Sequence, residues 1–181
     1  MQVCVPAGLS WPVCVCGEEA PIVRLESLTH GWDAQKEIVK AEPFMSYVVH
    51  DAVAQAGKAD RLPELCRAWS QFLTDGYDTI GEDWAHGTHV HGWSCTPTKD
   101  MVFYTLGVTP AEPGYAAVRV APRLGGVAWA EGKVPTPHGL IGVRATTDRV
   151  TVDSPVPLIV DLKGQEPQKL PAGRHEITAE G

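Results

Sequence analysis

Long apolar runs, a surplus of positive charge and a paired-cysteine framework are all missing from this sequence of 181 residues. No apolar run reaches the roughly 18 residues that a membrane-spanning helix needs, and no basic stretch precedes the apolar residues of the N-terminus. The sequence therefore predicts no membrane partner and no signal peptide, with the cytoplasm as the expected location. The formal net charge of -7 argues against a nucleic-acid partner, because such a partner would favour a basic face.

The five cysteines are odd in number and scattered, which does not fit a disulfide framework. Cys4, Cys14 and Cys16 could together recruit a metal, but a second cysteine pair at the usual zinc spacing is absent. We therefore predict no metal site there. Cys66 falls on the apolar stripe of a predicted helix, where a free cysteine usually just packs.

Helical spacing dominates the chain before about residue 110. The first predicted helix covers residues 42–56, begins with Pro43 in its first turn and ends at Gly57. Its apolar side chains recur every four residues, at Phe44, Val48, Ala52 and Ala56.

A second helix is predicted from Asp60, as N-cap, to Gly76. Its expected buried stripe consists of Leu62, Leu65, Cys66, Trp69, Phe72 and Leu73. Two such helices joined by a short turn make an antiparallel hairpin. A third helix is predicted from Ser94 to Leu106, with Gly107 as its end.

After Gly114 the pattern changes to short β-like runs bracketed by prolines. The predicted strands cover residues 117–121, 126–130, 140–145, 149–152, 158–162 and 175–179. Thr147 and Asp148 look like a tight hairpin connection, and the spacing of the runs predicts an antiparallel β-sandwich. The expected fold class is therefore α+β. Residues 1–30 form an unassigned irregular segment, residues 31–110 the helical hairpins and residues 111–181 the sandwich.

The polar stretch from Thr79 to Ser94 is the densest in chemically useful side chains. It contains Thr79-Ile-Gly-Glu-Asp-Trp84, and then His86-Gly-Thr-His-Val-His-Gly-Trp-Ser94. Carboxylates can carry proton and water chemistry, and aromatic faces can stack on the C–H face of a sugar ring. Acid, imidazole and indole side chains in one loop before a helix therefore predict a carbohydrate site.

Further motifs give this stretch a family context. They are Val39-Lys-Ala-Glu-Pro-Phe44, His91-Gly-Trp-Ser94, Leu106-Gly-Val-Thr-Pro-Ala-Glu-Pro-Gly114, Leu124-Gly-Gly-Val-Ala-Trp129 and Gly132-Lys-Val-Pro-Thr-Pro-His-Gly139. With these motifs, the chain from about Val39 onward resembles the C-terminal part of the bacterial α-L-rhamnosidase family and its six-hairpin glycosidase relatives. The resemblance implies the last hairpins of an (α/α)6 barrel, followed by a C-terminal β-sandwich. It also implies hydrolysis of terminal α-L-rhamnosides with inversion and without an organic cofactor.

The resemblance also assigns roles to residues of the polar stretch. Glu82 takes the position of the base that activates water, while His91, Trp93 and Trp84 line the sugar subsite. The family's general acid lies in an earlier part of the barrel, which this sequence has no room for. An inverting hydrolase needs two carboxyl groups roughly 6.5–9.5 Å apart, and Asp83, adjacent to Glu82, is a poor substitute for the second.

Structural interpretations of the same residues stay open. Glu82 could be an ordinary loop carboxylate, and Trp84 and Trp93 could belong to a core, as we expect for Trp69 and Trp129. The spacing of His86, His89 and His91 permits metal binding, but a carboxylate or cysteine complement is not apparent in the sequence, so no metal is predicted.

The sequence as a whole predicts an α-L-rhamnosidase-like glycoside hydrolase segment with little or no hydrolysis by itself, and a rhamnoside as its ligand. The alternatives are a non-catalytic carbohydrate-binding module and an inert fragment. An isolated pair of barrel hairpins leaves apolar stripes uncovered, which predicts self-association or an upstream barrel segment as partner.

Overall fold

The computed structural model describes residues 41–179, so the segment expected to be irregular, residues 1–30, lies outside the described residues. The described chain forms two compact units. Residues 41–58 and 69–95 make a helix–loop unit, and residues 59–68 and 96–179 make a sandwich unit. The fold class is α+β, as predicted from the sequence. Among the described helices, none combines the length and apolarity needed to span a bilayer.

The helix–loop unit begins with a 3-10 turn, η1 (Pro43–Met45), that continues into α2 (Ser46–Gln55). The predicted helix is therefore confirmed, but the apolar residues that recur every four positions along it are not the ones that are fully buried. Ser46, His50 and Val53 are the buried residues of α2. The buried hydroxyl of Ser46 donates to the Glu42 carbonyl over 2.9 Å, which satisfies it locally and makes its burial tolerable.

The second predicted helix is a chain of short turns. Its parts are η2 (Ala59–Arg61), α3 (Leu62–Cys66), η3 (Arg67–Trp69) and α4 (Ser70–Thr74). Leu62, Trp69 and Phe72 are buried as predicted, whereas Leu73 is 71% exposed and its predicted burial is wrong. Gly76 ends the helical stretch with a positive φ of 87°.

The third predicted helix divides likewise. A 3-10 turn, η4 (Gly92–Ser94), precedes α5 (Thr96–Asp100), which continues as one π-helical turn, η5 (Met101–Thr105). Gly107 follows with φ of 77°, so the predicted end of this helix is confirmed.

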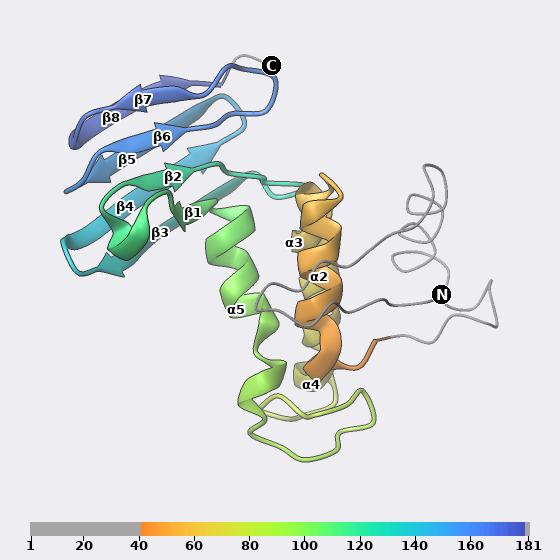
Figure 1. Ribbon diagram of the computed structural model, residues 1–181. Helices are drawn as coiled ribbons and strands as arrows, with labels where there is room; N and C mark the ends of the chain where they lie inside the picture. Colours follow the sequence, from red (N-terminus) through yellow and green to blue (C-terminus); the bar gives the residue numbers. More distant parts are fainter. Residues whose placement is uncertain (1–40, 180–181) are drawn as a thin grey trace. The chain divides into compact units, whose positions relative to one another are not determined.

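Eight strands form the two sheets of the sandwich unit (Figure 1). They are β1 (Val108–Pro110), β2 (Val118–Val120), β3 (Trp129–Thr136), β4 (Gly139–Thr146), β5 (Arg149–Ser154), β6 (Leu158–Val160), β7 (Gln168–Leu170) and β8 (Gly173–Thr178). A 3-10 turn, η6 (Pro113–Tyr115), separates β1 from β2. The strand orders are β1-β2-β6-β7 in one sheet and β3-β4-β5-β8 in the other.

The core of this unit lies between the two sheets. Val118 and Leu158 from one sheet and Ile141 and Val152 from the other belong to one buried cluster. Along β5, buried residues alternate with exposed or half-buried ones, because successive side chains of a strand point to opposite faces. The predicted sandwich is therefore confirmed.

Three details of the sheets differ from the prediction. The β2 and β6 strands pair in parallel, and the β3–β4–β5 meander supplies the long connection that a parallel pair requires. Strand β3 covers Trp129–Thr136 instead of the predicted residues 126–130, so it runs through Pro135, which we expected to bracket a strand. This position is tolerated because β3 is at the edge of its sheet. Strands β1 and β7, each of three residues, were not predicted.

Candidate active-site loop

The loop that follows Gly76 holds Glu82 by its backbone on both sides. The Glu82 N–H donates to the Thr88 carbonyl over 2.9 Å, and the Glu82 carbonyl accepts from the Phe44 N–H over 3.3 Å. A β-bridge pairs Gly81 with His89 next to it. The loop is therefore fastened to itself and to the start of the first helix.

The two neighbouring carboxylates of the loop have different environments. Asp83 Oδ1 accepts hydrogen bonds from the N–H groups of Ala85 and Gly87, at 2.8 and 2.9 Å, so Asp83 stabilises the turn of the loop. Glu82 is half-buried, and within residues 41–179 its carboxylate has neither a hydrogen bond nor an ion pair. Of the two, Glu82 is therefore the carboxylate available for chemistry.

Trp84 is held mainly by protein groups of its own unit. Its indole N–H donates to the Ala41 carbonyl and its backbone N–H to Glu42 Oε2, each over 2.8 Å. The ring stacks on Phe72 with centroids 5.9 Å apart and meets the edge of Trp69 at 5.2 Å. Through these contacts Trp84 anchors the loop. Its role in binding a sugar stays a prediction.

His91 and Trp93 lie at the C-terminal end of the loop. His91 Nδ1 is hydrogen-bonded to the buried Ser94 hydroxyl at 2.9 Å, and its backbone N–H donates to the Ile80 carbonyl. Trp93 is 68% exposed and stacks at 6.5 Å on Tyr47 of α2. His91 is thereby oriented by the loop itself, and Trp93 presents indole surface to solvent.

The other two histidines of the loop have partners of their own. His86 Nε2 lies 2.9 Å from Asp75 Oδ2, and His89 Nδ1 lies 3.2 Å from the Thr79 hydroxyl. Both rings stack on Tyr77, with centroid distances of 4.5 and 4.3 Å. These histidines and Tyr77 form one stack that stiffens the loop.

The backbone beside His91 is strained. Val90 has a φ of 58°, in the left-handed region that a β-branched side chain rarely adopts. Its side chain is 80% exposed, so burial does not favour this conformation. Strain of this kind costs about 1–3 kcal/mol and clusters at functional sites, which supports a functional reading of the loop.

Glu42, Phe44 and Tyr47 contribute to this region, and sequence reasoning assigned them no role in it. Glu42 anchors Trp84, the Phe44 ring meets the edge of the His91 ring at 6.5 Å, and Tyr47 supports Trp93. The available signal was the Glu-Pro-Phe sequence within the first of the family-like motifs.

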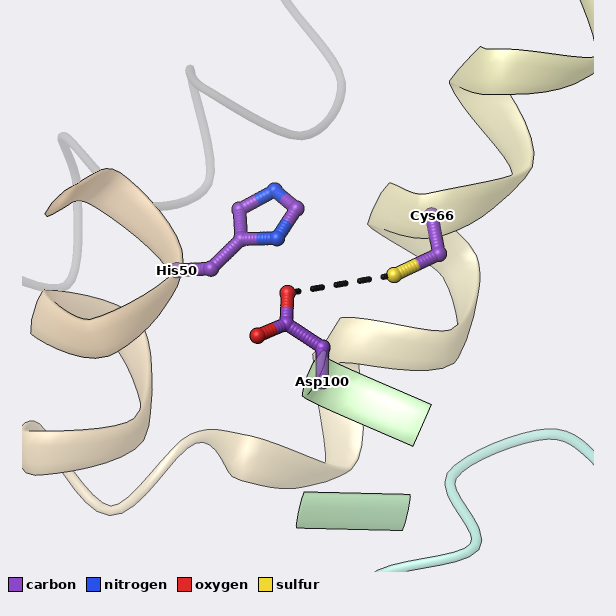
Figure 2. A group of neighbouring side chains, drawn as sticks. All are labelled: His50, Cys66 and Asp100. Atoms are coloured by element: carbon purple, nitrogen blue, oxygen red, sulfur yellow. Dashed lines mark hydrogen bonds between the residues drawn. The ribbon is translucent and has the colours of Figure 1, made fainter. Parts of the chain in front are cut away.

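Cys66 was expected only to pack, and in the sandwich unit its thiol is half-buried beside an acidic side chain. Figure 2 shows its thiol directed at the buried Asp100, with Sγ 4.0 Å from Oδ2. Burial, and then the Asp100 charge, raise the pKa of the Cys66 thiol to about 12. The nucleophilic thiolate is therefore disfavoured at neutral pH.

Residues 107–163 match the bacterial alpha-L-rhamnosidase C-terminal domain family. The resemblance to the C-terminal part of this family is thereby confirmed.

Solved rhamnosidases share the fold. The chain is similar to a GH78 family rhamnosidase of Bacillus sp. GL1, with 24% identity and a TM-score of 0.65 over 82% of this chain and 18% of that one. It is also similar to an α-L-rhamnosidase from Dictyoglumus thermophilum, with 14% identity and a TM-score of 0.68 over 90% of this chain and 23% of that one. A rhamnosidase from Aspergillus terreus matches with 18% identity and a TM-score of 0.58, over 74% of this chain and 18% of that one. The chain thus spans about a fifth of the length of these enzymes. No curated protein matches it.

Proposed function

We propose that the chain provides the base-bearing C-terminal segment of an α-L-rhamnosidase-like glycoside hydrolase. The observation that carries this proposal is the contrast between the two loop carboxylates. Asp83 is used by the loop backbone, whereas Glu82 is half-buried and without a partner among residues 41–179. A carboxylate held in place by its backbone, with its oxygens left open, suits a general base.

In this mechanism, Glu82 takes a proton from water as the water oxygen attacks the anomeric carbon of a terminal α-L-rhamnoside. The bond to the leaving-group oxygen breaks in the same step, so the configuration inverts. A protonated carboxyl group must deliver a proton to that oxygen, and Asp83 is committed to the loop. We propose that polypeptide outside this 181-residue sequence supplies this acid, and that His91 binds sugar hydroxyls.

A non-catalytic sugar-binding module is the second candidate. It is favoured by Trp93, whose indole is 68% exposed and is backed by Tyr47. An exposed, supported aromatic ring can stack on a sugar without any chemistry. L-Rhamnose should then quench the tryptophan fluorescence of the parent chain but not that of Trp93→Ala. Such quenching, together with no hydrolysis of an α-L-rhamnoside, would favour this function.

A substrate that needs no acid tests the proposal directly. Fluoride leaves α-L-rhamnosyl fluoride without protonation, so a segment with a base and no acid should release fluoride from it. Glu82→Gln should slow this release by at least about tenfold, because general-base catalysis contributes at least that much. A fluoride electrode measures the rate, and methyl α-L-rhamnoside, whose leaving group requires an acid, should stay intact.

Asp83→Asn is the matched control for this experiment. It makes the same carboxyl-to-amide change one residue away and keeps an oxygen to accept the loop hydrogen bonds, so its rate should equal that of the parent chain. Equal fluoride release by the parent and Glu82→Gln, or none by either, contradicts a working base on this segment. Hydrolysis of methyl α-L-rhamnoside would contradict the assignment of the acid to other polypeptide.

Exposed apolar side chains of the helix–loop unit lead to a prediction about assembly. Leu73, Val90 and Trp93 are 71%, 80% and 68% exposed, and such side chains favour association when they gather on a surface. Sedimentation velocity should therefore show dimers or larger species, and Trp93→Ser should shift the distribution toward monomer. A monodisperse monomer at all concentrations would refute this prediction.

A further inference from the structure

The sandwich unit contains a cleft at the side where its two sheets end. Strand β7 is the last strand of one sheet and β8 the last strand of the other. Residues of both strands line a cavity of about 520 Å³, together with Gln165 from the loop that precedes β7. This volume lies within the range of about 300–1,000 Å³ that is usual for small-molecule sites.

Polar side chains stand in this cleft at inner-face positions. Gln168 of β7 is directly opposite Val160, and His175 of β8 is directly opposite Val152. Paired residues of neighbouring strands share a face, and both valines belong to the buried core. Gln168 and His175 therefore depart from the apolar pattern of the inner faces, and such departures concentrate at functional sites.

Hydrogen bonds fix the cleft near both ends of β8. His175 Nε2 donates to the Pro171 carbonyl over 2.8 Å, because a carbonyl oxygen can only accept. The Gln165 amide donates to the Thr178 carbonyl over 3.3 Å. In the neutral imidazole, Nδ1 is then an acceptor, and the Gln168 amide can both donate and accept.

The charge of the lining selects against anions. Glu176 is the one acidic residue among the lining residues, and it pairs with Arg149 of β5 at 2.8 Å. No lysine or arginine is among the lining residues, and Arg149 is paired with Glu176, so a phosphate, sulfate or sugar acid would meet no unpaired cation from the lining. Leu170 and Ile177 add an apolar surface against which C–H groups can pack.

We infer that the cleft between β7 and β8 is a binding subsite for a neutral saccharide. Sugar hydroxyls would bind the Gln168 amide and His175 Nδ1, while a C–H face of the ring would pack on Leu170 and Ile177. The inference goes beyond the proposed function and does not depend on it, because Glu82 and its loop take no part in this subsite. It gives the sandwich unit a role in holding a carbohydrate chain.

Ligand-detected saturation-transfer NMR on the full chain tests the inference, since this method suits weak binding to a self-associating protein. D-Glucose and D-galactose are the neutral probes and D-glucuronate is the charged one, while L-rhamnose is left out because the loop of the proposed function would bind it. At least one neutral sugar should show a saturable signal, and glucuronate should show none. Gln168→Ala should weaken the binding by about two- to tenfold, which corresponds to one lost hydrogen bond.

Two further sets of variants separate this subsite from the loop. Gln168→Phe should abolish the cleft signal, because it replaces the sugar-binding amide by a ring that projects into the cleft, and it removes no hydrogen bond of the fold. Glu82→Gln and Trp93→Ala should leave the cleft signal unchanged. Neutral sugars without a saturable signal, equal binding by the parent and Gln168→Phe, or stronger binding of glucuronate would each overturn the inference. Loss of the signal in Trp93→Ala alone would place the sugar on the loop.

Discussion

Replacing Gly107 by alanine is expected to lower the free energy of unfolding of the sandwich unit by about 2–6 kcal/mol. Gly107 has a φ of 77°, which costs an L side chain about 1–3 kcal/mol. A Cβ there would also lie 2.2 Å from the carbonyl carbon of Ala121. The Gly107 carbonyl accepts the Ala121 N–H over 2.8 Å, so relief of the clash disturbs this hydrogen bond.

Gly164→Ala is the matched control for Gly107→Ala. Gly164 has a similar φ, 84°, in the same unit, and an added Cβ would meet no atom within 4 Å among the described residues. Gly164→Ala should therefore lower the free energy of unfolding only by the conformational strain, about 1–3 kcal/mol. Urea unfolding followed by far-ultraviolet circular dichroism measures both variants. If both variants lose the same free energy of unfolding, the close approach of Gly107 to Ala121 does not contribute to the effect of Gly107→Ala.

Gly107 also illustrates what the sequence could and could not predict. A glycine after an apolar helical stretch predicts a helix end from local chemistry, and the structure confirms that end. The close approach to Ala121 depends on the pairing of β1 with β2, in which Val108 is opposite Val120. Such a contact arises from tertiary structure, so local spacing does not contain it.

The candidate loop also combines features that the local sequence predicts with features that arise only from tertiary structure. Chemical density in the sequence drew attention to the stretch around Glu82, and in the structure Asp83 accepts two hydrogen bonds from the loop backbone. Glu42 and Tyr47 were missed because they come from the first helix and meet the loop only after folding. Leu73 was misplaced because short 3-10 turns, at η2 and η3, rotate later side chains relative to a regular helix.

Phe72→Ala is expected to lower the free energy of unfolding of the helix–loop unit by about 3–5 kcal/mol, the usual cost of emptying a buried phenylalanine site. Phe72 is 1% exposed and stacks on Trp84. A Cβ at Gly81 would lie 3.1 Å from Phe72 Cε1, so the ring packs closely against the segment before Glu82. Removing the ring therefore withdraws the support of the candidate base as well as core volume.

Leu73→Ala provides the comparison, because it removes an apolar side chain one residue away on the solvent side of the helix. The free energy of unfolding of Leu73→Ala should stay within about 0.5 kcal/mol of that of the parent chain. Urea unfolding followed by tryptophan fluorescence reports mainly on this unit, since Trp69, Trp84 and Trp93 lie in it and, of the described tryptophans, only Trp129 lies in the sandwich unit. If Phe72→Ala also lowers Glu82-dependent fluoride release under conditions where the protein stays folded, the ring positions the loop. Similar unfolding midpoints for the two variants would instead show that Phe72 is not a core residue of this unit.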